Sequence, residues 1–152
     1  MWLGATLAFF SDIPVAATHA KIADPHVKVG FAAGDGGSVI WPQLIGYARA
    51  KEYLLTGEPI TGEAAAKIGL INRAVPLEDL DGAVEEFTSK FASGAGRAIQ
   101  YTKLSINVGL KQLVATVMEA SFAYEALSNV SRDHAEAVKA FRDKRTPNFT
   151  GK

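Results

Sequence analysis

The sequence predicts an α/β protein in which a strand-and-loop segment, residues 1–76, precedes a helical segment, residues 77–152. Two observations predict this division. Glycines, prolines and short runs of small or β-branched residues fill the first segment, whereas apolar residues recur at helical spacing through the second. A length of 152 residues with 48% hydrophobic composition is enough to bury a core.

The first segment opens with a helix and two strands. Residues 4–10 are small and apolar, which favours a short buried helix lying close to neighbouring backbone. Residues 12–18 and 20–23 are predicted strands. Asp24-Pro25 predicts a turn, because proline fixes its own φ and moves the preceding residue out of the helical region. The glycine-rich residues 34–37 predict a second loop.

Helices dominate from Trp41 onward. Residues 42–54 are predicted helical, and residues 61–69 form a small helix with Thr61 as its N-cap. A short strand is predicted over residues 71–75. The remaining predicted helices cover residues 77–91, 98–107, 110–127 and 134–144.

One face of the predicted helix over residues 110–127 is largely apolar. Its residues recur at helical spacing: Val114, Val117, Met118, Ser121 and Phe122. Such a face either packs on the core of the same chain or forms a subunit interface, and the pattern leaves both open.

Composition excludes several classes of protein. Sixteen basic and sixteen acidic side chains balance to zero, so no net positive charge favours binding to nucleic acid. The chain has no cysteine, which excludes disulfides, thiolate metal sites and a cysteine nucleophile. The apolar residues 3–10 are far fewer than the ~20 that span a bilayer, and no basic segment precedes them as in a secretory signal. These features predict a soluble cytoplasmic protein without a membrane partner.

Two features of the first segment are candidates for chemistry. The helix start around Leu3 and Gly4 presents backbone N–H groups that can hold developing negative charge. His26, with Asp35 in the glycine loop, is a general-base arrangement in which a carboxylate orients an imidazole. The other interpretation of His26 is a turn residue. No metal site is predicted, because none of the histidines has ligand spacing: His19, His26 and His134.

The C-terminal stretch pairs an aromatic residue with a cation. Phe141 and Lys144 are three residues apart and are predicted to share one helix face. A ring beside an ammonium group suits the base and the phosphate of a nucleotide. The alternative is a solvated terminal helix with a packed phenylalanine.

Taken in order, these motifs resemble the crotonase superfamily, the enoyl-CoA hydratases and isomerases. The resemblance extends over essentially the whole chain. It rests on LGATLA at residues 3–8, SDI at 11–13, DPHVKVG at 24–30, AGDGG at 33–37, LLTGEPI at 54–60, GLINRAVP at 69–76, FRDKR at 141–145 and PNF at 147–149.

The resemblance implies the last turns of a ββα spiral followed by a C-terminal helical trimerisation domain, assembled as a homotrimer or hexamer. It implies an acyl-CoA substrate whose carbonyl is held by a backbone N–H group at Leu3 beside Gly4, which stabilises an enolate. Phe141 and Lys144 fall on the CoA-binding positions of the family. No cofactor is implied beyond the coenzyme A of the substrate.

The chain departs from the family pattern at two places. Family hydratases carry two glutamates that handle water, and those positions here hold Thr6 and His26, so the family's hydration mechanism is not expected. Family chains also begin further upstream, so Met1 is expected to lie within the fold, as in a truncation at an internal methionine codon.

Two further functions stay open beside chemistry on an acyl-CoA. His26 and Asp35 resemble the histidine–aspartate pair of the β-diketone hydrolases, which cleave a carbon–carbon bond with an enolate as leaving group. In that case His26 is the base, Asp35 fixes its tautomer and the substrate is a β-dicarbonyl compound. The other possibility is a non-catalytic remnant whose helices only self-associate.

Overall fold

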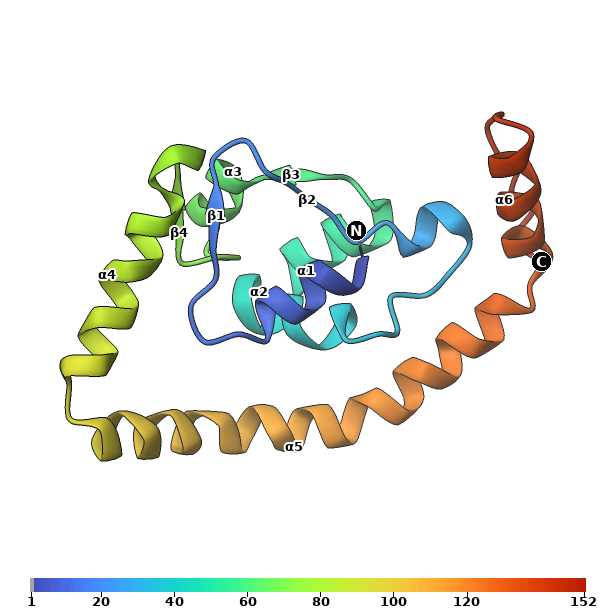
Figure 1. Cartoon of the computed structure of the whole chain (residues 1–152). Helices are drawn as coiled ribbons and strands as arrows, with labels where there is room; N and C mark the ends of the chain where they lie inside the picture. The colour runs from blue at the N-terminus through green and yellow to red at the C-terminus, as the bar shows by residue number, and fades with distance from the viewer. Residues whose placement is uncertain (1) are drawn as a thin grey trace.

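The computed structural model describes residues 2–152, with side chains from Gly4 onward. A small α/β core occupies the centre, and three C-terminal helices form an open frame around it (Figure 1). The core elements are α1 (Trp2–Phe9), β1 (Val15–Ala17), β2 (Lys21–Ile22), the 3-10 helix η1 (His26–Val29), α2 (Gly37–Thr56), β3 (Ile60–Thr61), α3 (Gly62–Lys67) and β4 (Arg73–Val75). The frame consists of the 3-10 helix η2 (Leu77–Asp79), α4 (Leu80–Ser93), α5 (Gly96–Asn129) and α6 (Arg132–Arg142).

Two small sheets tie the core together. Strand β1 pairs with β4 in parallel, with Val15 opposite Arg73, and β2 pairs with β3 in antiparallel orientation, with Ile22 opposite Ile60. Helix α3 begins directly after β3, where the Thr61 side chain accepts a hydrogen bond from the N–H of Ala64 at 3.2 Å. This confirms the predicted cap.

The centre of the core is apolar and closely packed. Trp41 is only 1% exposed and meets the Phe9 ring edge-on, with the ring centroids 5.3 Å apart. The other buried members of this cluster are Ile40, Ala50, Leu54, Ile60, Ala65, Leu70 and Ile71. Helix α1 therefore packs on α2. This confirms the helix predicted near the start of the chain, which is buried on the side that faces α2.

Two predicted helix boundaries were wrong. Helix α2 starts at Gly37, not near residue 42, because Gly36 takes a φ of 114° and starts the helix there. The predicted helices 98–107 and 110–127 are one continuous helix, α5. Gly109 lies between them, and a single glycine costs only about 1 kcal/mol in a helix interior, so it does not end the helix.

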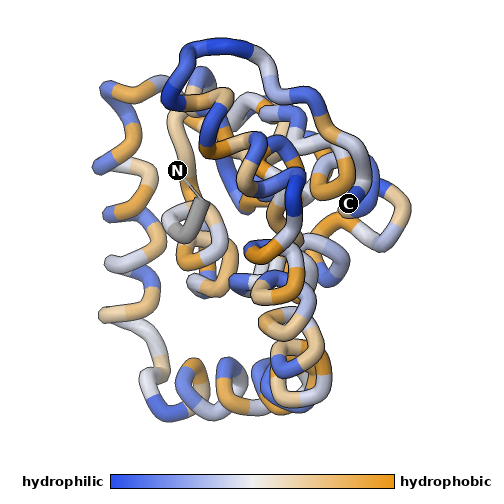
Figure 2. The backbone as a smooth tube through the Cα atoms, turned by 90° about the vertical axis from the view of Figure 1, so that its right-hand side faces the viewer, coloured by the Kyte–Doolittle hydropathy of each residue, from blue (hydrophilic) through white to orange (hydrophobic). Residues whose placement is uncertain are grey.

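The frame helices bury little of their apolar surface. Figure 2 shows hydrophobic residues along α4 and α5 as well as in the core. On the predicted apolar face of α5, Ser121 is buried, but Phe122 is 53% exposed. That face is therefore only partly packed on its own chain. No helix among residues 2–152 is long and apolar enough to cross a bilayer.

Candidate functional site

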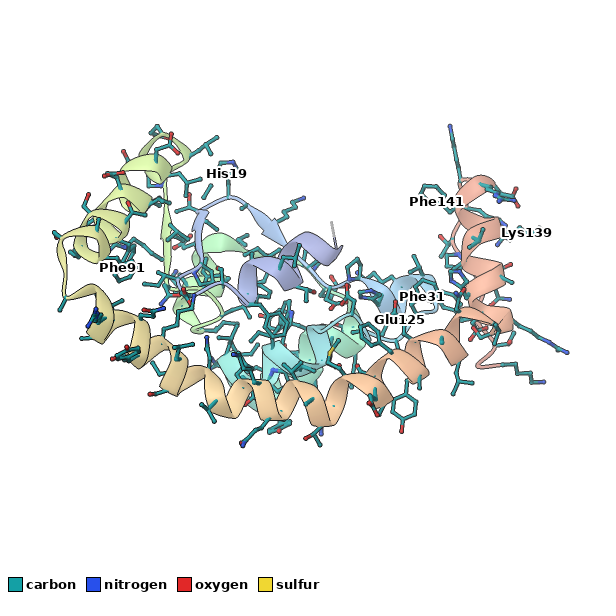
Figure 3. All side chains as sticks on the ribbon, turned by 60° about the horizontal axis from the view of Figure 1, so that its bottom comes forward. His19, Phe31, Phe91, Glu125, Lys139 and Phe141 are labelled. Carbon is teal, nitrogen blue, oxygen red and sulfur yellow. The ribbon has the colours of Figure 1, made fainter. Side chains whose placement is uncertain are left out.

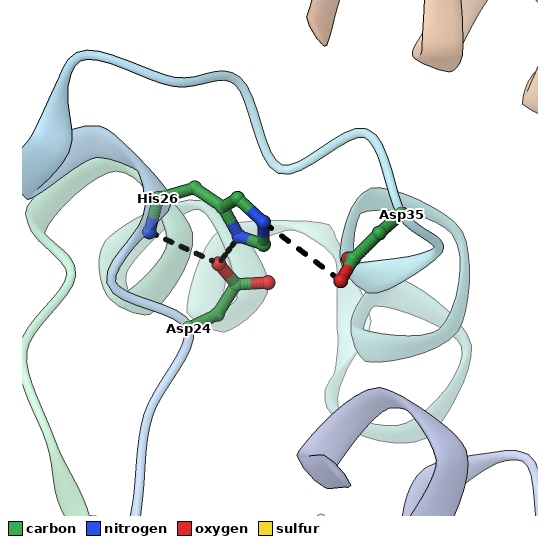
Figure 4. A group of neighbouring side chains, drawn as sticks. All are labelled: Asp24, His26 and Asp35. Carbon is green, nitrogen blue, oxygen red and sulfur yellow. Dashed lines mark hydrogen bonds and ion pairs between the residues drawn. The ribbon is translucent and has the colours of Figure 1, made fainter. Parts of the chain in front are cut away.

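His26 opens η1 and is almost completely buried, with 2% of its surface exposed. Its Nδ1 atom contacts Oδ1 of Asp24, which is also buried. The backbone N–H of His26 donates to the same carboxylate oxygen at 3.4 Å. Asp24 therefore holds both the ring and the backbone of His26 from one side (Figure 4).

Asp35 faces the opposite edge of the imidazole. Its Oδ2 atom lies 3.8 Å from Nε2 of His26, beyond a direct hydrogen bond but within ion-pair range. The Thr6 hydroxyl, on α1, donates to Oδ1 of Asp35 at 3.4 Å. The structure thus brings together Thr6, His26 and Asp35, three residues singled out from the sequence.

The role predicted for Asp35 within this group was wrong in one respect. The residue at Nδ1 of His26, the atom whose partner fixes the tautomer, is Asp24. With a proton on Nδ1 donated to Asp24, Nε2 carries the lone pair of the ring and faces Oδ2 of Asp35.

Opposing effects set the proton affinity of His26. Burial alone lowers the pKa of the imidazole, whereas the hydrogen bond and charge of Asp24, followed by the charges of Asp35 and Glu125, raise it. The net pKa is raised above the ordinary value of 6.5. Protonated His26 is therefore stabilised by three carboxylates, as suits a base that must hold a proton during a reaction.

Close approaches at two glycines shape the site. A Cβ atom at Gly37 would collide with the Asp24 carboxylate. A Cβ atom at Gly34 would lie 2.5 Å from Cβ of Glu125 and 2.6 Å from the carbonyl oxygen of Ser121. The glycine loop therefore allows α2 to approach Asp24 on one side and α5 to approach the loop on the other.

The predicted oxyanion residues lie in the first turn of α1. Leu3 and Gly4 both belong to this helix, and the first N–H groups of an α-helix have no partner within the helix. Through the Thr6 hydroxyl, the same helix contacts Asp35. Thr6 thus connects α1 to the side of the site on which Asp35 faces the imidazole.

The residues around His26 also include the atom types that bind divalent cations. Asp24, His26 and Asp35 each bring one such atom within 4.8 Å of the others. Because the Nδ1 atom of His26 is already in contact with Asp24, the arrangement is that of an oriented base.

The predicted CoA-binding residues lie apart from this cluster. Phe141 is 85% exposed near the end of α6 (Figure 3). The prediction that it shares a helix face with Lys144 was wrong, because α6 ends at Arg142 and Lys144 has a left-handed φ of 53°. The N–H groups of Lys144 and Arg145 bond back to Phe141 and Ala140, which closes the helix in a Schellman-type end.

Sequence reasoning missed two residues of the site. Asp24 carries a usable signal, because an aspartate two residues before a histidine, across a proline, can accept hydrogen bonds from the following residues. Glu125 carries none, since it lies on an amphipathic helix 99 positions from His26 in the chain. Only the packing of α5 against the loop reveals its charge at the site.

Comparison with known proteins defines the class to which this fold belongs. Residues 3–152 match the family model described as enoyl-CoA hydratase/isomerase. A short-chain-enoyl-CoA hydratase of Clostridioides difficile is 34% identical over 139 residues, which cover 91% of this chain and 90% of that protein. A 1,2-epoxyphenylacetyl-CoA isomerase of Escherichia coli is 33% identical over 98% of this chain. The chain belongs to the enoyl-CoA hydratase/isomerase family, which confirms the crotonase resemblance.

Solved structures agree with this assignment. A carnitinyl-CoA dehydratase from Mycobacterium avium superposes with a TM-score of 0.90 at 28% identity, covering 98% of this chain and 58% of that one. An enoyl-CoA hydratase/isomerase from Pseudoalteromonas atlantica gives 0.86 at 25% identity. The fold is thus crotonase-like. The chain spans nearly the whole of the Clostridioides relative, but only 57% of the Escherichia one.

Proposed function

We propose that this chain acts on an acyl-CoA thioester by moving a proton at the carbon next to the carbonyl, through an oxyanion-stabilised enolate. The observation that supports this proposal best is the buried imidazole of His26, anchored at Nδ1 by Asp24 and facing Asp35 at Nε2. A base of this kind, close to a helix start, suits proton abstraction beside a carbonyl.

The proposed step uses three groups of the chain. Nε2 of His26 takes a proton from the α-carbon, and the C–H electron pair moves into the carbonyl to form an enolate. Backbone N–H groups at Leu3 and Gly4 hold the enolate oxygen. The imidazolium, stabilised by Asp24 and Asp35, then gives the proton back. Return to the α-carbon regenerates the thioester, whereas in a β,γ-unsaturated thioester delivery to the γ-carbon moves the double bond to the α,β position and completes an isomerisation.

Hydration by a pair of carboxylates is not proposed. Thr6 occupies one of the two family positions, and its hydroxyl is hydrogen-bonded to Asp35. Phe141 and Lys144 stay the candidates for holding the nucleotide of coenzyme A, and a homotrimer or hexamer stays the proposed assembly.

A specific observation also favours a second function, hydrolysis of a carbon–carbon bond in a β-diketone. Asp35 and Nε2 of His26 stand 3.8 Å apart, so both can reach a small nucleophile such as water. In this reaction Nε2 takes a proton from water as the water oxygen attacks a ketone carbon. The bond between that carbon and the next one breaks, and the imidazolium protonates the leaving enolate.

Two substrates distinguish the proposals. Butyryl-CoA incubated with the chain in deuterium oxide should exchange its α-protons, which NMR records directly. A cyclic 1,3-diketone should be opened to a keto acid only if the second function is right. A chain that does neither supports the third interpretation, a non-catalytic remnant that self-associates.

A further inference from the structure

Helix α5 contacts both ends of the loop that carries Asp35. Ser121 is the one residue buried within α5, whose 34 residues are all described. Its Oγ atom lies 2.7 Å from Oγ of Ser38, in the first turn of α2 after the loop. Near the other end of the loop, the backbone N–H of Ala32 donates to Oγ of Ser128 at 3.0 Å.

The contacts come from a single face of the helix. Ser121, Glu125 and Ser128 are four and three residues apart, so their side chains project from the same side of α5. The middle residue, Glu125, lies against Gly34, next to Asp35. Ser128 is itself oriented, because its hydroxyl donates to the carbonyl of Glu125 at 2.7 Å. Figure 3 labels Glu125 on α5 and Phe31 in the segment that leads into the loop.

We infer that Ser121 and Ser128 are positioning residues that clamp the Asp35 loop against His26 through these two hydroxyl contacts. Their part in catalysis rests on the proposed function, whereas their effect on the geometry of the loop does not.

The physical reason is that the Asp35 carboxylate is held only by long contacts. Residues 32–36 form no regular secondary structure, and Asp35 reaches its partners only at long range, at 3.4 Å to Thr6 and 3.8 Å to His26. A shift of the loop by a fraction of an ångström therefore changes how strongly Asp35 acts on the imidazole. Restraints at both ends limit such a shift.

Two hydroxyl deletions in the 152-residue chain test the inference. Ser121→Ala and Ser128→Ala each remove one contact, while Ser105→Ala removes a hydroxyl from an exposed position of the same helix and serves as the control. Ser128→Thr keeps the hydroxyl and should behave like the parent chain. The readouts are the NMR titration of the His26 ring and amide hydrogen exchange, both recorded without substrate.

Ser128→Ala should speed exchange of the Ala32 amide by about 10-fold, because one hydrogen bond of typical strength is lost. Both alanine variants should lower the titration midpoint of His26, because Asp35 is held less closely while Asp24 and Glu125 remain in place. Ser105→Ala and Ser128→Thr should leave the midpoint unchanged.

An unchanged His26 midpoint in both alanine variants, even with reduced stability, overturns the inference and leaves the serines with a purely structural role. This outcome is separate from failure of the proposed function. A chain that shows the midpoint shifts but exchanges no α-protons keeps the clamp and loses the acyl-CoA assignment.

Discussion

His26 is held from two sides by carboxylates with different tasks. Asp24 fixes the ring through Nδ1, and Asp35 faces the working nitrogen Nε2. A histidine in contact with Asp24 alone would be oriented but would lack a charged group near the reacting atoms. Asp35 supplies this charged group, so His26 and Asp35 together form a candidate catalytic pair.

Asp24→Asn tests the orienting role. The change keeps the size of the side chain but removes its charge, so the pKa of His26 should fall and the hold on its tautomer should weaken. We expect α-proton exchange of butyryl-CoA to slow by ~100-fold or more. The NMR titration of His26 supplies the second measurement. A normal exchange rate in this variant would show that Asp24 is dispensable.

The raised pKa of His26 also predicts how stability depends on pH. Folding favours the protonated imidazole, so its contribution is complete below the ordinary pKa of 6.5 and is lost as pH rises through the higher folded-state value. Urea unfolding at pH 5.5 and pH 8.5 should therefore show a loss of stability at the higher pH. In His26→Gln this loss should shrink, and an equal loss in both chains would contradict the assignment.

The sequence identified the working residues better than their roles. Thr6, His26 and Asp35 stand out because their residue types fit a known family pattern, and the fold does bring them together. Which carboxylate meets which ring nitrogen depends on the turn at Pro25 and on the approach of α2 at Gly37. Those are tertiary features, and spacing in the chain does not determine them.

At the scale of elements, the site depends on where α5 passes the glycine loop. This contact joins residues 34 and 125, far apart in the chain. The sequence predicted two helices in place of α5, because apolar periodicity does not show whether a single glycine interrupts a helix. The Schellman-type end of α6 likewise separates Phe141 from Lys144, although three-residue spacing predicted a common face.

Gly34→Ala tests the close approach of α5. The added methyl group would meet Glu125 and the carbonyl of Ser121, so either the loop or the helix must move. We expect a loss of about 1–3 kcal/mol in the free energy of unfolding. Gly82→Ala in α4 is the matched control, because a Cβ atom there meets nothing within 4 Å. Equal unfolding midpoints for the two variants would refute the contact.

At the scale of the whole molecule, much apolar surface is uncovered. An apolar cavity of about 1010 Å³ separates the start of α5 from α1 and α2, with Phe10, Ile40 and Ile106 among its lining residues. Further along α5, Leu127 is 66% exposed. Surface of this extent is typical of proteins that associate.

We therefore expect the chain to associate in solution. Sedimentation should give a mass that is a multiple of 16.2 kDa, and Phe122→Glu should lower it because a charge is placed on an exposed apolar face. Lys111→Glu, an exposed change on the same helix, is the control. A well-behaved monomer would contradict the expectation.

Whether His26 moves the proton can be tested by comparing three chains. The rate of α-proton exchange in butyryl-CoA should be measured for the parent chain, for His26→Ala and for His19→Ala, which removes an exposed histidine. We expect a loss of at least ~100-fold in His26→Ala alone. Equal exchange rates in all three chains would contradict it.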